Sequence, residues 1–235
     1  MKNLLFGILF ILSIQLSAQT WINWDFTVPQ GKEMQIQQAF DTFMTSETGK
    51  ILGYAAMTSN DLGMQTHTHS FSVWHEDISK ISPFLNWSMI MSNADFQQIF
   101  TKFGELGIEG YQASTGTHLI SSEPAMGNSF QTLWFFTAKD PMKTAMAFKK
   151  MVTATQPMLS ENNVAVSLGQ IMSGASNGES HYVIATFKNY ETFMNFSGNI
   201  YQTDAFLAFS EATSDNINTR TISRSAMGVW NMSAN

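Results

Sequence analysis

The chain contains the same short string twice. Trp24-Asp25-Phe26-Thr27 returns about 110 residues later as Trp134-Phe135-Phe136-Thr137. Further landmarks recur in the same order in the two halves: Ala39 and Phe40 with Ala147 and Phe148, Met57 with Met172, His69 with His181, and Asp95 and Phe100 with Asp204 and Phe209. Their spacing drifts by a few residues, as insertions in loops would produce. The sequence therefore predicts one fold unit used twice in tandem.

Hydrophobic periodicity predicts the same order of elements in each half: strand, helix, strand, strand, helix, strand. In the first half we expect strands over 21–28, 51–59, 67–74 and 111–120, a turn over 60–63, and helices over 32–48 and from about 78 and 93. In the second half we expect strands over 133–138, 164–172, 181–187 and 220–230, and helices over 141–156, 190–197 and 203–212. This order is that of the split βαβ, ferredoxin-like unit.

Two fused ferredoxin-like units of about 100 residues each resemble the dimeric α+β barrel superfamily. That superfamily includes antibiotic-biosynthesis-monooxygenase-like, haem-degrading monooxygenase-like and chlorite-dismutase-like proteins. The resemblance implies an α+β fold in which two sheets face each other as a barrel with helices outside. A fused duplicate would build this pseudo-dimeric barrel within one chain. The resemblance covers two repeats, residues 20–122 and residues 130–235, which residues 123–129 join as a linker.

The first residues are typical of a targeting segment. Lys2 precedes an almost unbroken apolar run from Leu4 to Leu16, and Ser17-Ala18-Gln19 supplies small residues for cleavage. The run is too short to span a bilayer comfortably, and no later stretch approaches that length. We therefore expect residues 1–19 to be a signal peptide, the mature protein to be periplasmic or secreted, and no membrane insertion after cleavage. The chain has no Cys, so disulfides do not stabilise it.

Charge argues against two classes of partner. The formal net charge is −6, and no basic cluster exceeds Lys149-Lys150. A nucleic-acid-binding protein needs a basic patch to neutralise phosphates, and an anionic membrane surface attracts polybasic segments. The sequence therefore predicts no nucleic-acid partner and no electrostatic membrane binding.

Strand alternation predicts which side chains of the first strand enter the barrel. One face carries Ile22, Trp24, Phe26 and Val28, and it suits the helices. The other carries Asn23 and Asp25, whose counterparts in the second half are Leu133 and Phe135. Polar groups on one side and apolar groups on the other favour a pocket for a small apolar or amphipathic ligand with one polar end. The alternative is a barrel whose opening is merely solvated there.

Histidines and arginines provide the other candidate site residues. His69 and His181 each begin a predicted third strand, so they form a pseudo-symmetric pair of candidate ligands or proton donors; equally, each could satisfy a carbonyl at a strand end. His67-x-His69 has chelating spacing but no clear third ligand, so we assign no metal. Arg220 and Arg224 share a strand face, where they would clamp a carboxylate or form an exposed pair.

The resemblance also suggests haem. Haem-degrading relatives are similar to this chain at Asn23 on the first strand and Trp74 on the third, and they place a proximal His on the following helix. Here that helix begins Ile78-Ser79-Lys80-Ile81, with no His. The axial ligand is missing, so haem binding or degradation is only a minor alternative.

The sequence thus predicts an exported barrel protein that binds a small molecule, either as a cofactor-free monooxygenase-like enzyme or without catalysis. The candidate ligand-binding residues are Asn23, Asp25, His69, Trp74, Phe135 and His181. The rival is a structural or protein-interaction module with a solidly packed barrel. The cofactor, if any, is not identified, and both a monomeric pseudo-dimer and a higher homo-oligomer fit. A cavity inside the barrel lined by Asn23, Asp25 and Phe135 would favour the small-molecule-binding role. A filled barrel interior with a broad exposed apolar surface would favour the structural or protein-interaction role.

Overall fold

The computed structural model describes residues 19–63 and 66–230. Residues 1–18 of the expected signal peptide lie outside this range. No helix in the described ranges is long and apolar enough to cross a membrane.

The two halves have the expected order of elements, with extra short helices in the first half. The first half contains β1 (Thr20–Thr27), α1 (Glu33–Thr45), α2 (Glu47–Ile51), β2 (Tyr54–Gly63), β3 (His69–His75), α3 (Ile78–Ile81), the 3₁₀-helix η1 (Ser82–Leu85), α4 (Trp87–Ser92), α5 (Ala94–Leu106) and β4 (Glu109–Ser121). The second half contains β5 (Phe130–Thr137), α6 (Pro141–Glu161), β6 (Ala165–Ser173), β7 (His181–Phe187), α7 (Tyr190–Ile200), α8 (Asp204–Ala212) and β8 (Ile217–Trp230).

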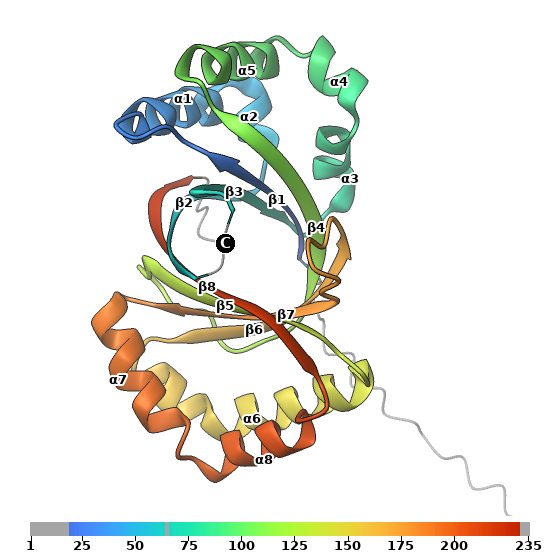
Figure 1. Cartoon of the computed structure of the whole chain (residues 1–235), viewed down its shortest axis with the longest axis vertical. Coiled ribbons are helices and arrows are strands. Elements are labelled where there is room, and N and C mark those ends of the chain that lie inside the picture. The colour runs from blue at the N-terminus through green and yellow to red at the C-terminus, as the bar shows by residue number, and fades with distance from the viewer. Residues whose placement is uncertain (1–18, 64–65, 231–235) are drawn as a thin grey trace, which may run out of the picture.

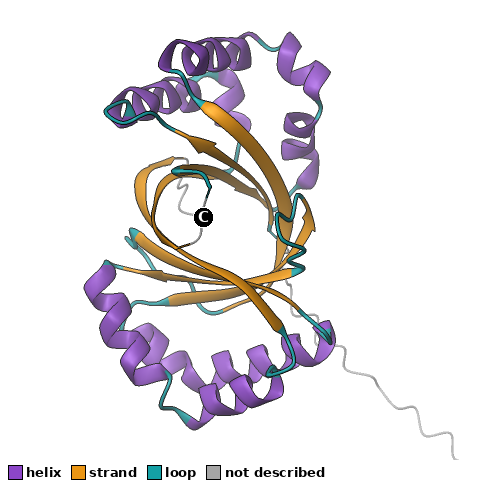
Figure 2. Ribbon diagram, in the orientation of Figure 1, coloured by secondary structure: helices purple, strands orange, loops and turns teal. Residues whose placement is uncertain are grey.

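The eight strands form one closed antiparallel barrel in the order β1-β3-β2-β8-β5-β7-β6-β4. Each half supplies four neighbouring strands, in the order 4-1-3-2 of its own numbering, which is the ferredoxin-like order. The pairs β2–β8 and β4–β6 join the halves. The helices of the first half cover one side of the barrel and those of the second half cover the opposite side (Figures 1 and 2). The predicted α+β barrel fold is confirmed.

Side-chain caps explain where several helices begin. Asp77, Asn93 and Asp140 each accept a hydrogen bond from a backbone N–H in the first turn of α3, α5 and α6. Pro141 stands at the start of α6, where its missing N–H costs no helical hydrogen bond. These starts match the sequence-based predictions.

The segment between α1 and β3 differs from the prediction. Ile51, expected to begin the second strand, is the last residue of α2, the strand begins only at Tyr54, and the turn expected over 60–63 is part of β2. Long-range pairing explains the longer strand, because β2 bonds to β8 as far as Gly63, opposite Ile222. Local turn residues cannot reveal a partner strand so distant in sequence. The helix expected over 32–48 ends at Thr45, and Gly49 lies within α2, where a side chain would collide with the Phe43 carbonyl.

The sheet faces separate three apolar clusters. Ile22 and Phe26 pack under the helices of the first half, and Phe136 and Phe187 under those of the second. A third cluster inside the barrel is built around these side chains: Trp21, Leu133, Tyr182 and Ile184. The predicted alternation along β1 is therefore confirmed.

Gly169 makes room for one of the large rings inside the barrel. A Cβ at this position would overlap the ring of Tyr182, which is 3% exposed. We expect Gly169→Ala to lower the free energy of unfolding by about 1–3 kcal/mol, because an overpacked core must shift rings or backbone. Chemical denaturation measures the change. Gly198→Ala is the matched control: its Cβ meets nothing within 4 Å in α7, so it should be neutral or stabilising.

Candidate functional site

A cavity lies inside the barrel, and both halves line it. Four of the six predicted ligand-binding residues are among its lining: Asn23, Asp25, Trp74 and Phe135. It encloses about 50 Å³, room for a few water molecules, and about 680 Å³ of unfilled space when its open mouth is counted. The interior is neither solidly filled nor a large chamber.

A hydrogen-bonded polar network occupies the first half's side of the cavity. Asp25 Oδ1 accepts from Ser70 Oγ at 2.6 Å and from Asn23 Nδ2 at 2.9 Å. Asn23 Oδ1 accepts from Ser72 Oγ at 2.6 Å. The register of β1 against β3 places Asn23 opposite Ser72 and Asp25 opposite Ser70, so strand pairing alone aligns these groups. Asp25 Oδ2 has no hydrogen bond within the described part of the chain, so it can accept one from a ligand.

Arg224 contributes a buried cation from β8. Its side chain is 7% exposed, and its Nε donates to Gln131 Oε1 at 2.9 Å. The structure shows no ion pair to Arg224 within residues 19–63 and 66–230. Burial lowers the pKa of Arg224, while the nearby Asp25 carboxylate acts in the opposite direction. An arginine remains charged under such a shift, so a permanent positive charge faces the cavity.

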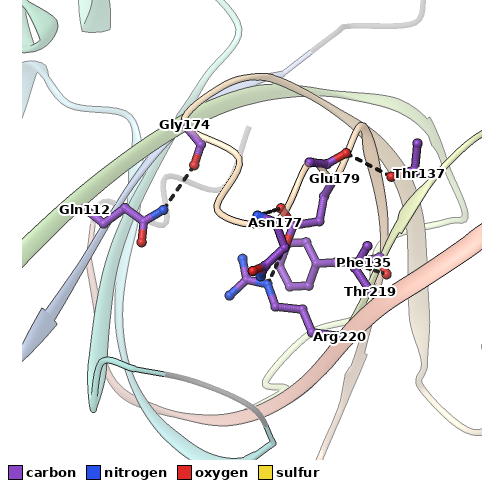
Figure 3. A network of polar contacts seen from close by, with 9 residues as sticks. Gln112, Phe135, Thr137, Gly174, Asn177, Glu179, Thr219 and Arg220 are labelled. Carbon is purple, nitrogen blue, oxygen red and sulfur yellow. Dashed lines mark hydrogen bonds and ion pairs between the residues drawn. The ribbon is translucent and has the colours of Figure 1, made fainter.

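Arg220 is held at the mouth of the cavity. Its Nε lies 2.7 Å from Glu179 Oε1, and its guanidinium carbon lies 4.3 Å from the centre of the Phe135 ring. The neighbouring loop between β6 and β7 is bound to β4 through Gln112 Nε2 and the Gly174 carbonyl, 3.3 Å apart (Figure 3). It follows that Arg220 and Arg224 have different roles, and neither belongs to an exposed pair.

Glu179 stays ionised to balance Arg220. Burial alone would raise the pKa of the Glu179 carboxyl, but hydrogen bonds from Asn177 and from the backbone of Glu179, together with the charge of Arg220, lower it overall. The backbone N–H of Asn177 donates to Glu179 Oε2 at 2.7 Å. This pair fastens the β6–β7 loop to β8.

Tyr182 and His118 form the apolar end of the cavity. Burial raises the pKa of Tyr182, and burial lowers the pKa of His118 to about 4. Tyr182 Oη lies 3.3 Å from His118 Nδ1, and the ring of Trp21 meets that of Tyr182 edge-on at 5.5 Å between centroids. Both titratable groups are therefore neutral at pH 7, and this end suits uncharged ligand atoms.

The low pKa of His118 predicts a loss of stability in mild acid. Between pH 6.5 and 4 the unfolded chain takes up a proton at His118 that the folded chain does not, so stability falls as the pH falls. We expect His118 to account for about 2 kcal/mol of the difference in free energy of unfolding between pH 7 and pH 5. Urea denaturation of wild type and His118→Gln at both pH values measures it. An equal loss in the two proteins would contradict this assignment.

His69 and His181 lie on the other face of the barrel wall. His69 stacks on Phe26 at 6.2 Å, and His181 stacks on Phe136 at 5.9 Å, both on the helix side. Thr68 Oγ1 lies 2.8 Å from the Nδ1 of His69, and burial lowers the pKa of both imidazoles. The structure therefore keeps the pseudo-symmetric pair but does not bring it together with the four residues inside the barrel.

The residues of the cavity do not fit a haem. The enclosed space is far smaller than a porphyrin, and the histidine lining it, His118, contacts Tyr182 on β7. The helices over 78–106, which follow Trp74, carry no His. Within the two described ranges, no three His, Cys, Asp or Glu side chains come close enough to hold a metal ion.

Sequence reasoning missed Gln131 on β5 as a cavity-side residue, although it shares a strand face with Leu133 and Phe135. It also missed Ser70, Ser72 and Tyr182 on the third strands. The alternation of the third strand in each half contained the necessary signal, since each of these strands begins with a His that faces the helices. Which of the two faces of each third strand points into the barrel could not be assigned from sequence, because that needs the pairing of Phe26 with His69 and of Phe136 with His181.

No family model and no curated protein matches the chain, but solved structures do. A candidate monooxygenase of Lactobacillus acidophilus is 12% identical with a TM-score of 0.64, over 90% of this chain and 95% of that one. One from Fusobacterium nucleatum is 13% identical with a TM-score of 0.62, over 92% and 95%. A haem-binding protein of Thermus thermophilus is 6% identical with a TM-score of 0.56, over 90% and 92%. The chain therefore has the dimeric α+β barrel fold, with both halves of the barrel in one polypeptide.

Proposed function

We propose that the barrel interior binds a small, largely apolar molecule through one acidic or anionic oxygen, and that the protein is a monooxygenase-like enzyme. The observation that carries the proposal is Arg224. A buried guanidinium without a paired carboxylate is costly, and a bound anion would compensate it. The Trp74 and Phe135 side chains line the same cavity and suit an apolar body. In line with the expected signal peptide, we also propose that the protein acts after export.

The polar groups suit the chemistry of an acidic substrate. Asp25 Oδ2 would accept a proton from a CH₂ group next to a carbonyl, and Arg224 would stabilise the resulting enolate oxygen. Dioxygen would then act as co-substrate and oxidant. In the balanced reaction, both C–H bonds of the CH₂ group and the O–O bond break, one oxygen atom becomes a new carbonyl, and the other leaves as water. Neutral Tyr182 and His118 would keep the apolar end free of charge.

A protein-interaction role is the second candidate, and one observation favours it. The segment from α3 to α4 consists of three short helices in the place that the single helix α7 takes in the second half, between the third strand and the last helix. Its large apolar side chains are exposed: Ile78, Leu85, Trp87, Met89 and Met91. Such a patch is typical of a contact surface. Both roles are compatible with this fold, so the ligand content of the barrel decides between them.

Native mass spectrometry of protein purified from its source tests the binding function. We expect a retained small molecule in wild type and its loss in Asp25→Leu, because the variant removes the hydrogen-bond acceptor facing the ligand. A melting curve on the same variant gives the control: the fold should remain intact, since leucine removes a half-buried charge. A molecule retained equally by both proteins would assign Asp25 to structure, and no bound mass in either would favour the interaction role.

A further inference from the structure

We propose that the loop between β6 and β7, residues 174–180, is a lid over the mouth of the barrel cavity, and that the ion pair of Glu179 with Arg220 is the latch that holds it closed. This inference rests on the proposed function, because it describes how a ligand reaches the barrel interior. Residues 174–176 line the cavity, so the loop forms part of its wall. Figure 3 shows the side chains of Glu179 on the loop and Arg220 on β8 directed toward each other at the mouth.

The closed cavity is too small to admit the proposed ligand unless part of its wall moves. It encloses about 50 Å³, whereas ligand pockets typically enclose about 300 Å³ or more. Every other described residue that lines the cavity lies on a strand of the closed barrel, where pairing with the neighbouring strands on both sides fixes its position. The loop is therefore the part of the wall that moves at the lowest cost.

The first part of the loop makes few contacts with the barrel. Ala175 and Ser176 are exposed, and they have no hydrogen bond within residues 19–63 and 66–230. Before them, the Gly174 carbonyl accepts from Gln112 Nε2 at 3.3 Å, which is long for a hydrogen bond of this kind. The loop therefore depends on its other end for a firm attachment to the barrel.

Glu179 supplies that attachment. Its side chain is buried although the residues before it in the loop are exposed, and its Oε1 lies 2.7 Å from Arg220 Nε. The same carboxylate accepts from the backbone N–H and the side-chain amide of Asn177, at 2.7 and 3.2 Å, so the turn is closed on itself. Thr137 Oγ1 adds a neutral hydrogen bond to the Gly178 carbonyl at 2.9 Å. Opening breaks the ion pair, but both charges regain water at the mouth, which offsets much of the loss.

Glycines stand at both ends of the exposed part of the loop. Gly174 has a φ of +80° and Gly178 a φ of +76°, which side-chain-bearing residues rarely adopt. A Cβ at Gly174 would also collide with the Ala113 carbonyl, so the closed position requires glycine there. Hinge residues absorb large changes in φ and ψ, and glycine does so at the lowest steric cost. The segment between the two glycines therefore has a hinge at each end.

Labelling of a single cysteine inside the barrel tests the lid without any ligand, because the chain has no Cys of its own. Ser72→Cys places a thiol at a lining position that is 3% exposed. In this background we expect Glu179→Ala to speed alkylation by iodoacetamide about tenfold or more, because the closed loop loses a charge-assisted hydrogen bond. Gly174→Ala should also speed it, since it obstructs closure and leaves the charges unchanged. Intact-protein mass spectrometry measures the rates.

Two controls in the same background separate lid opening from other causes. Glu161→Ala removes an exposed carboxylate at the end of α6 and should label at the rate of Ser72→Cys alone. Phe148→Leu lowers stability from a buried position under the helices, so it reports labelling through global unfolding. Its rate should also match that of Ser72→Cys alone.

Faster labelling in both loop variants and in neither control supports the lid, even where the barrel retains no ligand; the latter result would reject the proposed function alone. Unchanged rates in both loop variants, each shown to be folded by its melting curve, would overturn the lid, whatever the barrel binds. Faster labelling in Glu179→Ala alone would indicate a change of charge near the thiol, and an equal gain in Phe148→Leu would indicate unfolding; either would overturn it. So would labelling of Ser72→Cys as fast as that of an exposed Ser160→Cys, because the mouth would already be open.

Discussion

Residues 20–122 expressed alone should give no stable monomer. In the full chain, β2 pairs with β8 and β4 pairs with β6, so the isolated half would expose two unpaired strand edges. It would also expose the inward face of its sheet, where Trp21 now packs on Tyr182 of the other half. The apolar cluster between the sheet and helices of this half would remain, but the exposed sheet face and strand edges would favour association over a soluble monomer.

Size-exclusion chromatography with light scattering and urea denaturation measure this outcome. The expected species are aggregates or a homodimer that rebuilds the barrel from two copies of the first half. Residues 20–235 serve as the control and should unfold cooperatively. Mixing the half with residues 130–235 should restore a 1:1 complex through the same strand edges. A soluble, cooperatively unfolding monomer of 20–122 would contradict the barrel as the unit of stability.

Arg224→Met should abolish the preference of the barrel for anions. Benzoate and benzamide are nearly equal in shape and differ in charge, so their affinity ratio reports the contribution of the guanidinium. A charge-assisted hydrogen bond contributes roughly 1.5–3 kcal/mol, so benzoate should bind about 10- to 100-fold more weakly to the variant. Benzamide affinity should change little. Isothermal titration calorimetry gives both constants.

Arg220→Met is the matched control for Arg224→Met. It removes the same charge from the same strand, but its partner is Glu179 in the loop. Leaving that carboxylate buried and unpaired should lower the melting temperature, whereas Arg224→Met should leave it unchanged or raised. Benzoate affinity should fall less in the Arg220 variant. An equal fall in both variants would indicate a general electrostatic effect and not a contact with Arg224.

The fold was predictable because the repeat and the alternation are encoded locally. The paired strings at Trp24 and Trp134 indicate two equivalent units, and the strand–helix order of each unit identifies its topology. The faces of β1 followed from alternation alone, which correctly placed Asn23 and Asp25 inside. The same argument indicated that Arg220 and Arg224 share a face, and both line the cavity.

The rest of the site depends on contacts between distant segments. The partnership of Asp25 with Ser70 requires the register of β1 on β3, and that of Arg224 with Gln131 requires β8 beside β5. The loop between the strands predicted over 164–172 and 181–187 carried no predicted role. Its position at the mouth depends on Glu179 meeting Arg220, 41 residues further along the chain. None of these pairings leaves a local signal.

A crystal structure with 4-bromobenzoate tests the central claim most directly, because anomalous scattering from bromine locates the probe without bias. We predict one bromine peak inside the barrel, near Trp74 and Phe135, with the carboxylate of the probe hydrogen-bonded to Arg224. The same soak of Arg224→Met crystals should show no such peak. A bromine peak only outside the barrel, or equal occupancy in both crystals, would contradict the assignment of the barrel interior as an Arg224-dependent binding site.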